Sequence, residues 1–491
     1  MALDMAREEG LIDIRGLVEG LRSRRPKMVE NIQQYEWLHD AALEAVLCGD
    51  TCVNGTDLTN HYDHLITFDP ICGQAPIVEE FETLVIMTPK LNINHHCTIS
   101  QISLNKPKNR FADVLPADCH LPRLISLENN NNSNKQKNKP INPEQLNTDY
   151  INATLCDSYK RPGELIITQT PLPETTIDFW RLVWDYSVYS LIMVDDLGEH
   201  DESCQIYWPR GSVHSNTNTQ NRNHNIRNNV NSSHINDEAS NSHNSNSHNS
   251  HSNTNSNHTT DNNNKNNRDI NKLDINNLQF QRADTPISSC TTNTNAAETS
   301  IRFGPFEIEL LSKDDEIDLA VRTFRVTRHS SAMNGTLDSN AESLNSARNH
   351  FKGGSESRII KHFQLLAWPP KNSVPTSRNS TLRIISLIQK WRSQVSNLTQ
   401  HSAMSPIDGP EMASPRMLVH CIAGAGRSGT FGCCFNVVEQ LIAEKSADIF
   451  SQALKLRSHR PQLIESLDQY RFVYEVAGTF VDDTFDNTNS K

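Results

Sequence analysis

Apolar residues in this chain gather in short runs that are separated by long polar tracts. Three runs have the length and composition of buried strands: LIITQT at 165–170, SLIMV at 190–194 and RMLVH at 416–420. Three further segments alternate in the manner of sheet strands: 306–312, 323–329 and 358–368. Helical spacing appears at 178–186, and we also predict helices at 378–395 and after the glycines that follow residue 420. This mixture predicts an α/β domain with a central mixed sheet flanked by helices.

Four tracts are too poor in apolar residues to pack into a core: 129–148, 211–300, 329–356 and 397–415. The second is the most extreme, since residues 211–280 alone contain 24 asparagines. We expect this Asn-rich stretch, 211–300, to be a disordered insertion between two strands, because it lacks the apolar side chains that folding needs. Seven histidines between 214 and 258 offer weak metal binding as an alternative. We favour a solvated loop, since long surface insertions cost little free energy.

The chain contains an internal repeat. Residues 13–42 align without gaps to residues 448–477, with 11 of 30 positions identical. Each copy is predicted to form a helix, a turn and a second helix. In the second copy, Pro461 ends the helical pattern and a new helix begins at about Leu467. The repeat predicts that 1–52 is the C-terminal helical fragment of a preceding domain with its linker, and that 53–482 is the main domain. The alternative, two unrelated amphipathic helices, explains less, because LRSxRP and QY recur in one register.

Composition narrows the class of protein. A formal net charge of -12 argues against nucleic acid as a partner, since phosphate backbones need clustered Lys and Arg. No apolar run approaches the ~18 residues of a transmembrane segment, and the first residues lack the pattern of a signal peptide. The eleven cysteines are scattered and suggest neither a disulfide framework nor a zinc site. We expect a reduced, intracellular protein without metal or cofactor.

One segment carries the chemistry. The strand 416–420 continues directly into Cys421-Ile422-Ala423-Gly424-Ala425-Gly426-Arg427-Ser428. Small residues let successive backbone N–H groups form a cup for phosphate oxygens, and the following helix points its N-terminus at that cup. We expect the partial positive charge of this helix N-terminus, together with Arg427, to lower the pKa of Cys421 below the reference value of ~8.5. Such a thiolate in an electrostatic cradle suits covalent phosphoryl transfer, and no GxxxxGK[ST] motif suggests nucleotide binding.

The segment HCIAGAGRSGTF resembles the signature of the classical protein-tyrosine phosphatases. Further similar segments follow in the family's order: KNRF (108–111), DYINA (149–153), TQTPLPETTIDFWRLVWD (168–185), YWP (207–209), AWP (367–369) and QYRF (469–472). The repeat resembles the tandem domains of receptor-type phosphatases, with the main domain most similar to membrane-distal domains of the class that carries a MAM module. The resemblance implies a protein-tyrosine-phosphatase fold, a central twisted mixed sheet flanked by helices, and a cytoplasmic location as part of a membrane receptor.

The resemblance also assigns roles to residues. Cys421 becomes the nucleophile, Arg427 the phosphate clamp, Ser428 the leaving-group partner, His420 the residue that orients the loop, and Gln469 a water-positioning glutamine. The cup is formed by Ile422, Ala423, Gly424, Ala425 and Gly426. Substrate recognition falls to Lys108, Asn109, Arg110 and Phe111, which set the pocket depth for phosphotyrosine, and to Asp113, which holds the substrate backbone.

Several positions depart from the family's pattern. The mobile loop of the family reads Trp-Pro-Asp, whereas this chain has proline at Pro370, which cannot act as the general acid. A rate contribution of ~10²–10⁴ should therefore be missing, and two successive prolines should stiffen the loop. Phe111 stands where active members carry tyrosine, Ile422 replaces a small polar residue, and Glu465 replaces the catalytic glutamine of the final loop.

Three functions remain open on these grounds. The departures favour a low-activity regulatory domain that binds phosphotyrosine proteins, steadies an adjacent phosphatase domain of the same receptor, or senses oxidants through its cysteine. The alternative is an active phosphotyrosine phosphatase that acts through a cysteinyl-phosphate intermediate with water or a remote acid. The third is a purely structural role with an empty cup.

Overall fold

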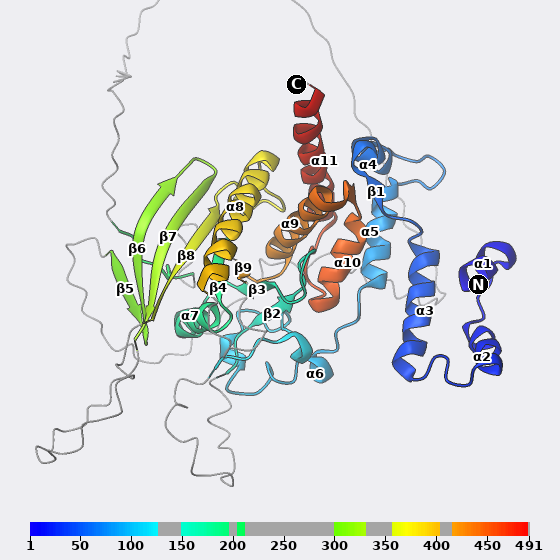
Figure 1. The fold of residues 1–491 in the computed structure, drawn as a ribbon, viewed down its shortest axis with the longest axis horizontal. Helices are drawn as coiled ribbons and strands as arrows, with labels where there is room; N and C mark the ends of the chain where they lie inside the picture. Colours follow the sequence, from blue (N-terminus) through cyan, green and yellow to red (C-terminus); the bar gives the residue numbers. More distant parts are fainter. Residues whose placement is uncertain (126–148, 196–203, 212–298, 330–355, 403–414, 490–491) are drawn as a thin grey trace, which may run out of the picture. The chain divides into compact units, whose positions relative to one another are not determined.

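The computed structural model describes residues 1–125, 149–195, 204–211, 299–329, 356–402 and 415–489. Its centre is an eight-stranded sheet with the order β2-β3-β9-β4-β8-β7-β6-β5 (Figure 1). The strands are β2 (Ala153–Cys156), β3 (Leu165–Gln169), β4 (Val188–Met193), β5 (Ser300–Phe303), β6 (Phe306–Asp315), β7 (Leu319–Arg328), β8 (Glu356–Leu365) and β9 (Arg416–Cys421). Strands β3, β9, β4 and β8 run parallel, and the other neighbours pair antiparallel. The predicted mixed sheet is confirmed, and so are the six strands predicted at 165–170, 190–194, 306–312, 323–329, 358–368 and 416–420; β2 and β5 were not predicted. The strand that we expected directly before the Asn-rich stretch is not observed, because residues 204–211 contain no strand.

Helices cover both faces of this sheet. They are α4 (Leu58–Ile66), α5 (Pro76–Met87), α6 (Ile93–His96), α7 (Thr176–Asp185), α8 (Arg378–Ser402), α9 (Gly426–Glu444), α10 (Ile449–His459) and α11 (Leu467–Asn489). Short 3₁₀ turns lie at η1 (Gly55–Asp57), η2 (Lys106–Lys108), η3 (Asp118–His120) and η5 (Pro173–Thr175). A two-stranded sheet joins β1 (Val53–Asn54) to β10 (Ser446–Ala447). In the described part of the chain, no helix is long and apolar enough to cross a bilayer.

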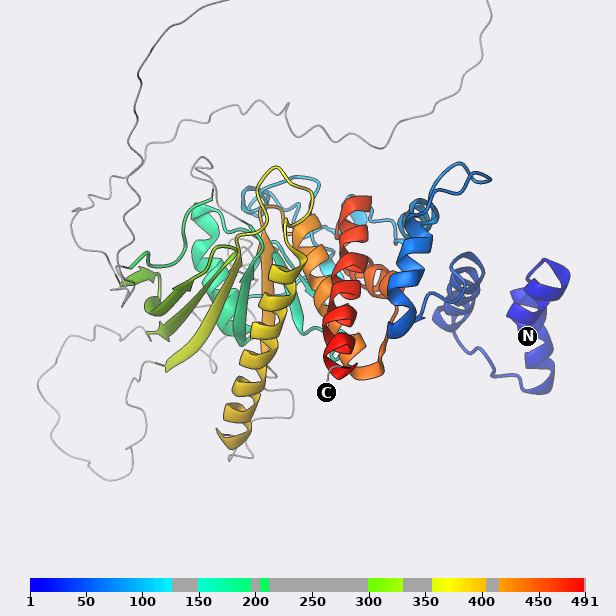
Figure 2. The same ribbon diagram turned by 90° about the horizontal axis from the view of Figure 1, so that it is seen from above.

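The central strands β3, β4 and β9 are mostly apolar, as expected for strands whose two faces are both buried. Neighbouring residues alternate between two cores, as side chains in a strand must. Ile167 and Val419 belong to the core formed with α4, α5 and α8–α11, whereas Ile166 and Leu418 belong to the core formed with α7. Helices α8, α9 and α11 lie side by side over the first of these cores (Figure 2). Strand β9, which leads into the predicted cup, is paired on both sides, by β3 and by β4.

The polar tracts mostly fall outside the described residues, including 129–148 and nearly all of the predicted disordered insertion 211–300. Two of the predicted tract boundaries are wrong by a few residues, because the structure describes residues at the end of one tract and at the start of another. Ser300 begins β5, and α8 runs through 397–402, which we had predicted would not pack. Its apolar residues Ile384, Ile385, Ile388 and Val395 are buried at helical spacing, so the helix is anchored well before residue 397 and extends beyond it.

Residues before the main domain form three helices: α1 (Ala2–Glu9), which precedes the first repeat copy, and α2 (Ile14–Arg24) and α3 (Ile32–Leu47), which contain it. Their small apolar cluster contains Ile14, Val18 and Ala42. The predicted helix–turn–helix is confirmed in both copies, as α2–α3 and as α10–α11.

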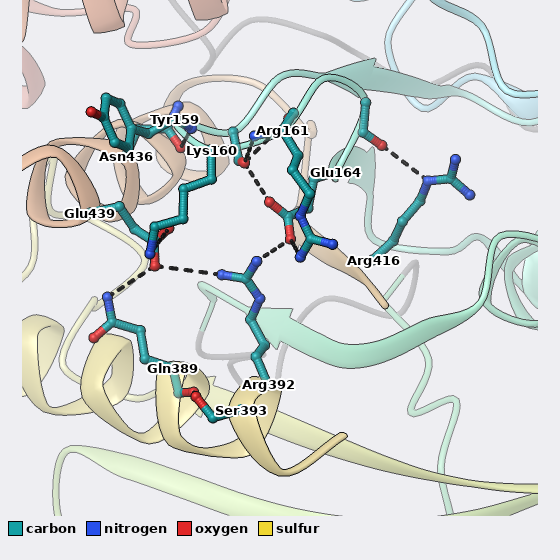
Figure 3. A network of polar contacts seen from close by, with 12 residues as sticks. Tyr159, Lys160, Arg161, Glu164, Gln389, Arg392, Ser393, Arg416, Asn436 and Glu439 are labelled. Atoms are coloured by element: carbon teal, nitrogen blue, oxygen red, sulfur yellow. Dashed lines mark hydrogen bonds and ion pairs between the residues drawn. The ribbon is translucent and has the colours of Figure 1, made fainter. Parts of the chain in front are cut away.

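A buried ionic network ties the turn before β3 to α8 and α9 (Figure 3). The carboxylate of Glu164, which is almost fully buried, bonds to Arg161, Arg392 and the Ser158 hydroxyl. Arg392 also lies 3.7 Å from Glu439 on α9, and Lys160 lies 3.0 Å from the same carboxylate. Because breaking a buried ion pair leaves an uncompensated charge, this network holds α9, and with it the loop before α9, against the sheet.

Candidate active site

The predicted cup lies between the end of β9 and the first turn of α9. Gly424 has φ +62°, and a Cβ at this position would lie 2.4 Å from the carbonyl carbon of Thr168, so only glycine fits. A Cβ at Gly429 would lie 2.6 Å from Leu463 Cβ, and one at Gly426 2.5 Å from the Glu465 carboxyl group. The glycines therefore let the loop and the helix start press against β3 on one side and the turn after α10 on the other.

The cysteine lies at the base of this cup. Cys421 Sγ is 2.8 Å from Ser428 Oγ, so the predicted nucleophile and its predicted leaving-group partner are in contact, and the Cys421 side chain is buried. Burial raises the pKa of Cys421, and the charge of Asp195 raises it further, while hydrogen bonds from Ser428 and from the backbone N–H of Ala425 lower it. Our expectation of a lowered pKa is therefore wrong for this loop, because desolvation and a carboxylate that the motif did not reveal outweigh the helix start.

The guanidinium of Arg427 is bonded to protein acceptors on two sides. Nη1 donates to Asp195 Oδ1 at 3.1 Å. The other acceptors are backbone carbonyls of the Trp-Pro-Pro loop: Trp368 at 3.4 Å, Pro369 at 3.1 Å, Pro370 at 2.7 Å and Asn372 at 3.3 Å. The guanidinium carbon also lies 5.4 Å from the centre of the Trp368 ring. The Trp-Pro-Pro loop thus presents carbonyl oxygens to the arginine that we predicted as the phosphate clamp.

Sequence reasoning missed Asp195. It lies two residues after the end of β4, and β4 pairs in parallel with β9, which ends in Cys421. The carboxyl ends of neighbouring parallel strands meet at one edge of a sheet, where α/β proteins bind ligands. The two strands were predicted, so a carboxylate after SLIMV was a signal that could have been used. Its side chain is fully buried, and desolvation raises the pKa of Asp195 to about 7, with Arg427 as the largest opposing influence.

His420 is held from both sides of its ring. Nδ1 lies 3.1 Å from Thr170 Oγ1, and Nε2 lies 2.6 Å from the Tyr207 hydroxyl. The same hydroxyl lies 3.2 Å from His362 Nε2. Burial lowers the pKa of His420 to about 3, so the ring is neutral and acts through hydrogen bonds. The predicted orienting role of His420 stays a prediction. The structure adds Tyr207 of the YWP segment as its partner, a residue that had served only as a family marker in the sequence.

The recognition loop is tied to the strand beside the cysteine. Arg110 N–H donates to Gln169 Oε1 at 3.0 Å, and its guanidinium donates to the Thr170 carbonyl at 3.1 Å. The Thr170 N–H in turn donates to the Cys421 carbonyl at 2.7 Å. Lys108 pairs with Asp178 at 2.8 Å, away from the cup.

The other recognition residues are less closely joined to the site. Asn109 Oδ1 accepts hydrogen bonds from Tyr150 and Asn152, so its side chain shapes the loop itself. Phe111 is half-buried and the Asp113 side chain is exposed. Among the hydrogen bonds of the described residues, Asp113 contributes its carbonyl, which accepts from Gln462 at 3.2 Å. The structure thus brings Arg110 next to the cup and places Phe111 and Asp113 on the same loop without a bond to it.

The final loop faces the cup with a carboxylate. Glu465 lies against Gly426, and burial raises its pKa while Arg427 lowers it. Gln469 Oε1 accepts from the Glu465 N–H at 3.0 Å, and its Nε2 donates to the Ser373 carbonyl at 3.3 Å. Gln469 therefore bridges the final loop and the Trp-Pro-Pro loop. Within the described ranges, no group of three or more His, Cys, Asp and Glu side chains is placed to hold a metal ion.

Comparison with known proteins agrees with this geometry. The model of the protein-tyrosine phosphatase family matches residues 1–44, 105–274 and 288–478. The chain is 27% identical to the receptor-type tyrosine-protein phosphatase U of Gallus gallus over 97% of this chain and 23% of that protein. It is 24% identical to receptor-type tyrosine-protein phosphatase alpha of Mus musculus and to epsilon of Rattus norvegicus, over 100% of this chain and 42% and 50% of those proteins. The chain thus spans between about a quarter and a half of the length of these relatives. A cysteine loop of this geometry, in a chain matched by the family along most of its length, identifies it as a member of the protein-tyrosine phosphatase family.

Proposed function

We propose that residues 53–482 form a receptor-type phosphatase domain that binds phosphotyrosine or a similar oxyanion in the cup but turns it over poorly. The observation that carries the proposal is the Trp-Pro-Pro loop. It approaches Arg427 as a substrate-covering loop would, yet its nearest groups are the carbonyls of Pro369 and Pro370. A carbonyl has no proton to give to the leaving tyrosyl oxygen, so general acid catalysis is missing from the place where the family has it.

The two carboxylates that border the cup support the same proposal. Asp195 bonds to Arg427, and Glu465 packs against the first residue of α9. Both carry negative charge when ionised, and a phosphate dianion is repelled by such charge where the dielectric is low. Such repulsion weakens binding. Asp195 also raises the pKa of Cys421, which reduces the fraction of nucleophilic thiolate.

The alternative is an active phosphatase, and one observation favours it. The cup, the cysteine and Ser428 are assembled, with Sγ and Oγ 2.8 Å apart. A substrate with a good leaving group needs no proton in the transition state, so such a site can still form the cysteinyl-phosphate intermediate. Activity on an activated aryl phosphate is therefore compatible with both functions, and only turnover of a phosphotyrosine peptide separates them.

The decisive experiment restores the acid. We expect wild-type protein to cleave an activated aryl phosphate measurably and a phosphotyrosine peptide poorly. Pro370→Asp should raise kcat/KM for the peptide by at least about tenfold, out of the ~10²–10⁴ that a general acid typically contributes. Asn372→Asp is the matched control, because it adds a carboxylate two positions further along the same loop. Cys421→Ser should abolish turnover while leaving oxyanion binding intact.

Contrary results are equally clear. Efficient cleavage of the peptide by the wild-type protein would overturn the low-activity proposal in favour of the active phosphatase. Failure of wild-type and Cys421→Ser proteins to bind vanadate or a phosphotyrosine peptide would leave a purely structural role. An equal rise in Pro370→Asp and Asn372→Asp would show that added charge, and not a restored acid, changed the rate.

We further propose the context in which this domain works. The repeat assigns 1–52 to the end of another phosphatase domain with its linker, which makes an adjacent phosphatase domain of the same receptor the expected partner. Phosphotyrosine proteins are the expected ligands, and the cytoplasmic side of a membrane receptor is the expected location. The similarity to receptor-type relatives supports each of these points.

A further inference from the structure

Asp195 is built into the wall of the cup without a catalytic role in the reaction described above. Its side chain is 0% exposed. Oδ1 accepts from Arg427 at 3.1 Å, whereas Oδ2 makes no hydrogen bond of good geometry to any described residue. The backbone carbonyl of Asp195 accepts from Gln364 Nε2 at 3.1 Å, which fixes the residue at the end of β4. A buried carboxylate with one oxygen unpaired is costly when charged.

The charged and titratable groups around Asp195 come from several elements. Arg427 favours its ionised form most, followed by the Ile422 backbone N–H and then by Arg110. The charge of Asp195 in turn raises the pKa of Cys421. Burial holds the pKa of the Tyr207 hydroxyl far above neutrality, and the charge of Asp195 raises that pKa as well. His420 is neutral, and Glu465 faces Arg427 from the final loop. The guanidinium of Arg427 is thus shared between Asp195 and whatever anion fills the cup.

Filling the cup changes this balance. A bound dianion interacts with the Arg427 guanidinium, which in the empty site stabilises the charge of Asp195. The dianion also places two negative charges close to the buried Asp195 carboxylate. Like charges in a buried site are relieved by protonation of one of them. The bound anion is held by the amide cup and the helix start, so the proton goes to Asp195.

We propose that oxyanion binding in the cup is coupled to the uptake of one proton by Asp195, which makes Asp195 a positioning residue that gates the site. This inference rests on the proposed anion-binding function. Below its pKa, Asp195 is already neutral and the anion binds without a proton. Above its pKa, binding must draw a proton from the buffer, so affinity falls by up to tenfold for each pH unit. The cup is therefore a better oxyanion site in mildly acidic than in mildly alkaline solution.

The test uses the full chain with Cys421→Ser, which removes the thiol as a competing titratable group. Tungstate is the probe, because its two charges stay fixed between about pH 6 and pH 8.5, the range around the pKa of Asp195. Calorimetry in buffers of different ionisation enthalpy counts the protons taken up. We expect uptake to rise from near zero to about one proton as the pH rises, with a matching tenfold loss of affinity per pH unit.

Asp195→Asn in the same background should bind tungstate with no such uptake, and more tightly at alkaline pH. Two controls keep the outcome specific. Glu465→Gln removes the other carboxylate near Arg427, and Asp185→Asn removes a half-buried carboxylate at the end of α7 whose pKa is also raised by burial. Both should keep the uptake. If Glu465→Gln abolishes it, or Asp195→Asn retains it, the inference is overturned.

Two results separate this inference from the proposed function. Absence of tungstate binding in the Cys421→Ser protein at every pH contradicts the proposed function itself. Binding without proton uptake contradicts only the role of Asp195. If Asp195→Asn does not fold, the protein with Cys421→Ser and Glu465→Gln still decides, because a protonated-carboxyl infrared band must appear in it on addition of tungstate at alkaline pH.

Discussion

The two copies of the repeat have the same local structure in different surroundings. Asp13 caps α2 by accepting from the Gly16 N–H, and Asp448 caps α10 by accepting from the Ser451 N–H. Arg22 donates to the carbonyls of Met28 and Val29 at 3.1 and 2.8 Å, as Arg457 does to those of Leu463 and Ile464 at 2.7 and 2.8 Å. Val29 and Ile464 share a left-handed backbone, with φ 58° and 54°. The same short-range contacts thus produce the same helix–turn–helix twice.

The two copies differ in how deeply their equivalent residues are buried. Arg460 and Tyr470 are fully buried in the main domain, whereas their partners Arg25 and Tyr35 are exposed and half-exposed. The second turn presses against Gly426 and Gly429 of α9, and the first turn lines an open groove of about 410 Å³. The comparison teaches that caps, turn and arginine bonds are encoded locally, while the stability of the second copy comes from the sheet and helices that cover it.

The largest difference should appear at the repeated tyrosine. Tyr470 is fully buried and its hydroxyl bonds to Glu80, so Tyr470→Ala should lower the free energy of unfolding by about 3–5 kcal/mol. Tyr35 packs edge-on against His39 at the surface, and Tyr35→Ala should cost less than about 1 kcal/mol. Urea denaturation of the full chain measures the first effect, and hydrogen exchange in α2 and α3 measures the second. Equal costs would show that the first copy is covered in solution as the second one is.

The repeated arginine should give the next largest difference. Arg457 is buried, bonds to the two turn carbonyls and also donates to Thr88 Oγ1 at 2.7 Å. Arg457→Ala leaves these acceptors unpaired and should cost about 3 kcal/mol, whereas Arg22→Ala exposes its two carbonyls to water and should cost under about 1 kcal/mol. Arg457→Lys keeps the charge but lacks the planar guanidinium with its several N–H donors, so it should recover only part of the lost free energy of unfolding. A full recovery in urea denaturation would assign the effect to charge alone.

The same contrast explains what could be predicted from the sequence. Caps, breaks and apolar runs are local, so β3, β9, α2 and α10 were found close to their observed positions. The five-residue cup was recognised because its residues lie between Cys421 and Arg427 in one contiguous segment. Strands β2 and β5 were missed because they lack a continuous apolar run, and their pairing partners decide their conformation.

The parts of the site that escaped prediction depend on chain segments far apart in sequence. Asp195 meets Arg427 across 232 positions, and the loop carbonyls of Pro369 and Pro370 meet it across 58 and 57. No local pattern marks such residues as neighbours. The pKa of Cys421 was predicted in the wrong direction for this reason, since the carboxylate and the burial that raise it belong to the tertiary structure.

The smallest expected effect tests whether the helix caps are equivalent. Asp448 also accepts a hydrogen bond from Thr51 Oγ1 at 2.8 Å, a contact that Asp13 lacks, so the two caps must be compared after that contact is removed. In a Thr51→Ala background, Asp448→Ala should cost about 1 kcal/mol, the typical value for an N-cap. Asp13→Ala should reduce the protection of α2 by a similar amount, because a cap acts on its own helix whether or not that helix is buried. Hydrogen exchange of the first-turn amides, including those of Gly16 and Ser451, measures both in the full chain. If removing the cap lowers the protection of α10 but not that of α2, the helix–turn–helix of the repeat is stabilised by packing and not by local contacts.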